Sequence, residues 1–86
     1  MKPVKSCAEL ERMIYARLFR LDEVQEDMTA DPRLDPKVSP PRWHERDSKG
    51  RNWNVASMNS AAVAYKTWVG EIVDYLRWKY DIEQSS

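Results

Sequence analysis

Few side chains in this sequence could do covalent chemistry. Cys7 is the one cysteine and His44 the one histidine among 86 residues. A thiol at the start of a predicted helix gains thiolate character from the helix dipole, so a nucleophile assisted by His44 is one hypothesis. However, a free cysteine on an apolar helix face is far more often a packing residue. We therefore predict a packing role for Cys7, a surface role for His44, and no enzymatic activity.

The acidic residues and the glycines do not form a recognisable ligand site. A zinc site requires three or four ligands among cysteine, histidine and carboxylate at suitable spacing. This chain has one cysteine and one histidine, so we do not expect a zinc site. The acidic stretch 22–35 lacks the spacing of a calcium loop, and Gly50 and Gly70 are too far apart for a phosphate-binding loop. Glu45 and Asp47 can share a strand face, where pairing with arginines is favoured over acid–base catalysis. We predict no metal and no cofactor.

The stretch around Trp43 and Trp53 combines aromatic rings with cations and amides. Stacking on aromatic rings together with phosphate contacts is how proteins hold single-stranded nucleic acid. Because the net charge is zero and the stretch 22–35 is acidic, nucleic acid is the less favoured partner and a protein the more favoured one. The predicted partner-binding rim consists of Arg46, Lys49, Arg51, Asn52, Asn54 and Trp78.

A first helix is predicted over about residues 6–27. Ser6 and Glu9 have the spacing of a capping box, and apolar residues follow at helical intervals from Cys7 onward. Tyr15 and Phe19 form a second apolar ridge on the far side of this helix. A single neighbouring helix cannot cover both faces.

A β-hairpin and a second helix complete the predicted fold. Prolines break the chain over the loop 28–41, and a hairpin is expected over about 42–56, with Gly50 in a left-handed conformation. Its register would place Asp47 opposite Arg51 and Trp43 opposite Val55, with both indoles turned inward. A helix follows over about 58–81, capped by Ser57 or Asn59, and the tail 83–86 is expected to fray. The predicted fold is one α+β domain of order α-β-β-α, with the two helices packed together and the hairpin over them.

The second predicted helix has more apolar surface than one neighbour can cover. Its apolar residues occupy nearly half of the circumference between Met58 and Tyr80. This surplus predicts self-association, as a homodimer or on a larger protein partner. The candidate residues for self-association are Tyr15, Phe19, Trp68, Ile72 and Tyr75.

The composition is that of a folded, water-soluble domain. Hydrophobic residues make up 42% and charged residues 33%, which is too apolar for a disordered chain and too polar for a membrane protein. No apolar run approaches the roughly 20 residues that span a bilayer, and no signal peptide is apparent. A lone cysteine fits a reducing compartment. We predict a cytoplasmic interaction, regulatory or accessory protein from a bacterium or a phage.

Overall fold

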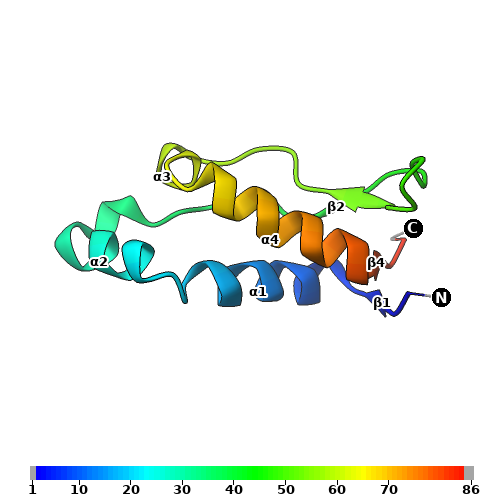
Figure 1. Ribbon diagram of the computed structural model, residues 1–86, viewed down its shortest axis with the longest axis horizontal. Helices are drawn as coiled ribbons and strands as arrows, with labels where there is room; N and C mark the ends of the chain where they lie inside the picture. Colours follow the sequence, from blue (N-terminus) through cyan, green and yellow to red (C-terminus); the bar gives the residue numbers. More distant parts are fainter. Residues whose placement is uncertain (1, 85–86) are drawn as a thin grey trace.

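Two helices running in opposite directions supply six of the twelve buried hydrophobic residues in the described core (Figure 1). The computed structural model describes residues 2–84 and confirms a small α+β domain in which a hairpin lies between helical parts of the chain. The elements, in chain order, are β1 (Val4–Lys5), α1 (Cys7–Leu18), α2 (Asp22–Ala30), the 3-10 turn η1 (Pro32–Leu34), β2 (Arg42–Trp43), β3 (Trp53–Asn54), α3 (Ser60–Val63), α4 (Lys66–Lys79) and β4 (Asp81–Ile82). The buried residues facing one another from the two long helices are Leu10, Ile14 and Leu18 of α1 and Val69, Val73 and Leu76 of α4.

The first predicted helix is correct at its start and wrong in its length. Ser6 and Glu9 form the capping box. The helix stops at Leu18, however, and α2 begins at Asp22 after Leu21 adopts an extended backbone. An unbroken helix over 6–27 would be about 33 Å long, against about 21 Å for α4, so its end would overrun the core. The break instead leaves Val24 of α2 completely buried.

The second predicted helix is also broken. Asn59 is the N-cap and its side chain accepts a hydrogen bond from the Ala62 amide, but α3 ends at Val63. Tyr65 then leaves helical geometry before α4 starts. Its hydroxyl donates to the Asp27 carboxylate, and this bond holds α2 against the junction of α3 and α4.

The hairpin forms with a register different from the predicted one. Asp47 lies opposite Arg51 as expected, and its amide donates to the Arg51 carbonyl over 2.9 Å. Gly50 has the predicted left-handed backbone, with φ of 81°. Trp43 pairs with Trp53, however, rather than with Val55. The segment 44–46 is therefore longer than its counterpart across the hairpin, so Trp53 is completely buried while Trp43 stays 41% exposed.

The proline-rich segment packs against α1 and covers the ridge predicted for self-association. The rings of Tyr15 and Phe19 are stacked 5.6 Å apart. The Tyr15 hydroxyl donates to the Val38 carbonyl over 3.0 Å and accepts from the Val38 amide over 2.9 Å. Pro36 and Val38 are buried here, whereas Leu34 is exposed. Tyr15 thus has a partner within the same chain, while Phe19 packs on Tyr15 and on the core.

A parallel pair of two-residue strands joins the ends of the described chain and was not predicted. Val4 of β1 pairs with Asp81 of β4, and Lys5 pairs with Ile82. The amide of Glu83 donates to the Lys5 carbonyl over 2.8 Å, so the predicted frayed tail is held at its first residue. Ser85 and Ser86, the end of that tail, lie outside the described residues.

Candidate interaction surfaces

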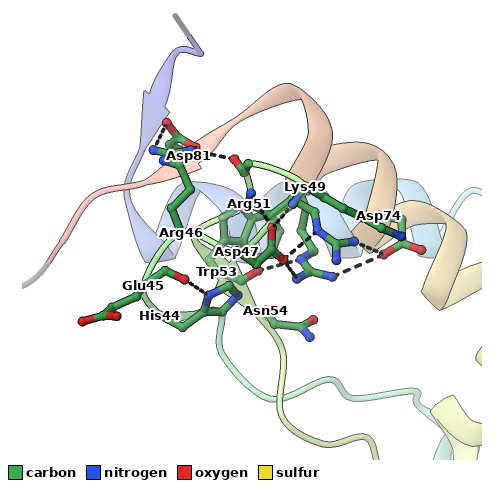
Figure 2. Close-up of polar contacts among 12 residues, drawn as sticks. His44, Glu45, Arg46, Asp47, Lys49, Arg51, Trp53, Asn54, Asp74 and Asp81 are labelled. Atoms are coloured by element: carbon green, nitrogen blue, oxygen red, sulfur yellow. Dashed lines mark hydrogen bonds and ion pairs between the residues drawn. The ribbon is translucent and has the colours of Figure 1, made fainter.

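Asp47 organises the turn of the hairpin. Its carboxylate accepts hydrogen bonds from the backbone amides of Lys49 and Arg51, both over 2.9 Å, and from the Arg51 guanidinium over 3.1 Å (Figure 2). The bond from the Arg51 amide has the largest effect on the pKa of Asp47, which these contacts lower to about 2. The positive charge of Arg51 is therefore paired with the Asp47 carboxylate of the same hairpin.

Arg46 ties the same turn to the C-terminal strand. Its guanidinium donates to both carboxylate oxygens of Asp81, over 3.0 and 2.9 Å, and to the Gly50 carbonyl over 2.6 Å (Figure 2). Lys2 reaches the same place and donates to the carbonyls of Gly50 and Arg77, each over 2.9 Å. The Arg46 guanidinium is the main cause that lowers the pKa of Asp81.

Asn52 takes the place of a further strand beside β4. Its side-chain carbonyl accepts from the Ile82 amide over 3.0 Å, and its side-chain amide donates to the Ile82 carbonyl over 3.3 Å. Only 8% of Asn52 is exposed. Because both ends of the amide are used, Asn52 has a structural role in the hairpin.

Arg77 connects α4 to the hairpin from beneath. It is 7% exposed, and its Nε donates to the Trp53 carbonyl over 2.6 Å. The guanidinium also lies 3.7 Å from the Asp47 carboxylate and 3.5 Å from that of Asp74. Burial lowers the pKa of Arg77. The indole nitrogen of Trp53 also donates a hydrogen bond, to the Tyr80 carbonyl over 3.0 Å.

We call this group of polar residues the hairpin clasp. It uses three of the six residues predicted as a partner-binding rim, namely Arg46, Arg51 and Asn52, to hold the fold together. Lys49 and Asn54 remain exposed at the hairpin, and the Asn54 side chain accepts a hydrogen bond from the adjacent Val55 amide. Lys2, Arg77 and Asp81 were not predicted, because the contacts that join them to the hairpin link residues distant along the chain. The members of the hairpin clasp are Lys2, Arg46, Asp47, Arg51, Asn52, Arg77 and Asp81.

The sixth predicted rim residue, Trp78, belongs to a different surface. Trp68, Tyr75 and Trp78 lie along the solvent side of α4 and are 38%, 39% and 68% exposed. The rings of Tyr75 and Trp78 are 6.1 Å apart, and the Arg17 guanidinium lies 4.7 Å from the centre of the Tyr75 ring. We call these three aromatic residues the α4 ridge. Ile72, the other self-association candidate on α4, is half-buried beside them and packs on the core.

A third feature is an open cavity of about 630 Å³ at the end of the molecule that carries β1 and β4. The Cys7 thiol lines this cavity and lies 3.2 Å from the Pro41 carbonyl. His44 does not line it, and its Nδ1 lies 2.7 Å from the Glu45 carbonyl. The structure therefore does not bring together the two residues of the nucleophile hypothesis. Within residues 2–84, no three His, Cys, Asp or Glu side chains are grouped to hold a metal ion.

Comparison with known proteins gives no family to which the chain could be assigned. No family model, curated protein or solved structure matches it. Within the described part of the chain, no helix has the length and apolar character needed to cross a membrane. Function must therefore be inferred from the side chains at the surface.

Proposed function

We propose that the protein is a non-catalytic interaction module that self-associates through the α4 ridge. The observation that carries this proposal is the exposure of Trp78, 68%, beside Tyr75 and Trp68 on one helix. Scattered apolar residues are ordinary at a protein surface, but neighbouring large rings are more typical of contact sites. Tryptophan and tyrosine are also enriched at the centres of protein interfaces, where each loses much exposed area on binding.

The ridge is held in place before any partner binds. Tyr75 lies between two cations, with the Arg17 guanidinium 4.7 Å and the Lys79 ammonium 5.7 Å from the centre of its ring. The Trp78 ring lies beside Tyr75, with the two ring centres 6.1 Å apart. A surface whose side chains are already ordered loses less entropy on association. These contacts support a recognition role for the ridge.

A nucleic-acid interface on the hairpin is less well supported. Arg46 is bonded to Asp81, and Arg51 to Asp47, so two of the cations near the turn are already neutralised. Arg42 and Lys49 are exposed and, within residues 2–84, lie in no ion pair. Phosphate binding strengthens with the number of free cations along the backbone. Two such residues are a weak basis for binding a polyanion.

We also propose that the protein acts in the cytoplasm. Cys7 is half-buried and free, which fits a reducing compartment such as the cytoplasm. An origin in a bacterium or a phage, as a regulatory or accessory protein, stays a prediction from the size and composition of the chain. A larger protein partner is the other expectation for the ridge, and it is an outcome of the following test.

Sedimentation velocity at increasing micromolar concentrations tests the proposal. We expect the wild-type chain to pass from monomer to dimer, and Trp78→Ala to remain monomeric because it removes the most exposed ring of the ridge. Trp43→Ala is the matched control, since Trp43 is 41% exposed but lies on the hairpin, and it should dimerise like the wild type. A wild-type chain that stays monomeric throughout would contradict self-association and leave a different protein as the partner.

A further inference from the structure

We propose that the second copy docks α4 against α4 in antiparallel orientation, with the two-fold axis passing beside Tyr75. This inference rests on the self-association proposed above and adds the orientation and register of the two copies. It follows from the charges on either side of Tyr75 together with the exposure of the α4 ridge. In this arrangement Glu71 of each copy faces Lys79 of the other.

The positions of the two charges select the antiparallel orientation. Residues four apart lie on the same side of a helix, so Glu71 and Lys79 flank Tyr75 at equal distances along the same face. A symmetric dimer uses the same patch from both copies. An antiparallel pair centred on Tyr75 therefore brings opposite charges together twice. A parallel pair would place Glu71 against Glu71 and Lys79 against Lys79, which is repulsive in both cases.

Both charged residues are available for such a contact. Glu71 and Lys79 are exposed, and neither forms an ion pair within residues 2–84. The Lys79 ammonium already lies over the ridge, 3.4 Å from the Tyr75 hydroxyl. Docking therefore need not break an internal salt bridge.

The apolar contacts of this register are also complementary. Tyr75 meets Tyr75 at the axis, and Trp78 lies at the level of Ile72 of the other copy. Trp68 is two helical turns from the axis and extends past the end of the partner helix at Lys79, so it contributes at the edge of the contact. Burying the exposed rings removes roughly 300 Å² per copy, whereas a stable interface needs about 500 Å² per copy. The remainder must come from the stems of flanking side chains, so the dimer should be weak, with dissociation in the micromolar range.

A charge exchange tests the register. We expect Glu71→Lys and Lys79→Glu each to weaken dimerisation by about tenfold, because each single change places like charges together twice. The double variant Glu71→Lys/Lys79→Glu should restore the wild-type dissociation constant, since it only exchanges the two ends of each pair. The controls are Glu26→Lys on α2 and Lys66→Glu at the start of α4. Both change an exposed charge away from the ridge, and both should dimerise like the wild type.

A mixture of the two single variants gives a second measurement that does not depend on the folding of the double variant. The mixture should form a heterodimer at concentrations at which each variant alone is monomeric, because opposite charges again face each other. Far-ultraviolet circular dichroism would verify that each variant is folded. A double variant as weak as the single ones, or single variants that dimerise normally while Trp78→Ala does not, would overturn this register and leave self-association through the ridge intact. A monomeric wild type would overturn both.

Discussion

The hairpin clasp and the α4 ridge differ in whether their side chains have partners. The clasp is rich in guanidinium, carboxylate and amide groups, yet Arg46, Arg51 and Asn52 bond within the chain. The ridge offers few hydrogen-bonding groups, and its Trp78 is the most exposed of the large hydrophobic residues described. The polar side chains of the clasp are therefore engaged within the chain. The exposed rings of the ridge form the surface that we propose for association.

Trp53, whose carbonyl accepts a hydrogen bond from Arg77 of the clasp, and Trp78 of the ridge should respond most differently to truncation. Trp53 is completely buried above α4, so Trp53→Ala should lower the free energy of unfolding by about 3 to 5 kcal/mol. For Trp78→Ala we expect a change within about 0.5 kcal/mol. Urea unfolding followed by circular dichroism, at concentrations low enough to keep the chain monomeric, measures both. Equal losses in the two variants would mean that Trp78 also belongs to the core, and the contrast would disappear.

A smaller contrast is expected between two asparagines of one strand segment. Asn52→Ala leaves the buried amide and carbonyl of Ile82 without partners and should cost about 1 to 3 kcal/mol. The exposed Asn54 side chain accepts a hydrogen bond from the adjacent Val55 amide, so Asn54→Ala serves as the control, with a change of less than about 0.5 kcal/mol. Hydrogen exchange should show faster exchange of the Ile82 amide in the first variant alone. Unchanged protection there would show that Asn52 does not hold β4.

Much of the fold follows from local patterns in the sequence. The capping box at Ser6, the left-handed Gly50 and the cap at Asn59 were predicted because each depends on residues close together in the chain. The two helix breaks, around Leu21 and at Tyr65, were missed because neither contains proline or glycine. Tertiary contacts, such as the bond from Tyr65 to Asp27, favour the break that local propensity does not show.

The surfaces were harder to predict than the elements. Alternation along the hairpin predicts solvent-facing positions for Arg46 and Asn52. Arg46 is exposed as predicted, although it pairs with Asp81, whereas Asn52 is buried against Ile82. The strand pair β1–β4 that supplies both partners could not be foreseen. Strands of two residues carry no hydrophobic period. The α4 ridge was predicted in part: Trp68 and Tyr75 were assigned to self-association, but Trp78 was assigned to the hairpin rim. The structure places the exposed Trp78 ring beside Tyr75 on the surface of α4.

The smallest expected effect is the acid sensitivity of the clasp. Folding lowers the pKa of Asp47 from 3.8 to about 2 and also lowers that of Asp81, so the unfolded chain binds these protons more tightly. Their contribution to stability is therefore complete above the unfolded pKa and is lost as the pH falls from about 4 toward 2. Melting temperatures across this range should fall less steeply for Asp47→Asn than for the wild type. Glu26→Gln, an exposed change on α2, should follow the wild-type curve, and an identical slope for Asp47→Asn would argue that the clasp is not ionic.

The contact between the two ends of the described chain also affects how fast the protein can fold. Lys2 donates to the Arg77 carbonyl, 75 positions away, and β1 pairs with β4 beside this bond. Bringing such distant residues together requires closing nearly the whole chain as one loop, which slows folding relative to helical proteins with local contacts. The helices can form early. The hydrogen bonds from Arg46 to Asp81 and between Asn52 and Ile82 can form only after the chain has been synthesised to Ile82 and β4 has paired with β1. Until then Arg46 and Asn52 lack the partners that hold the hairpin in the folded protein.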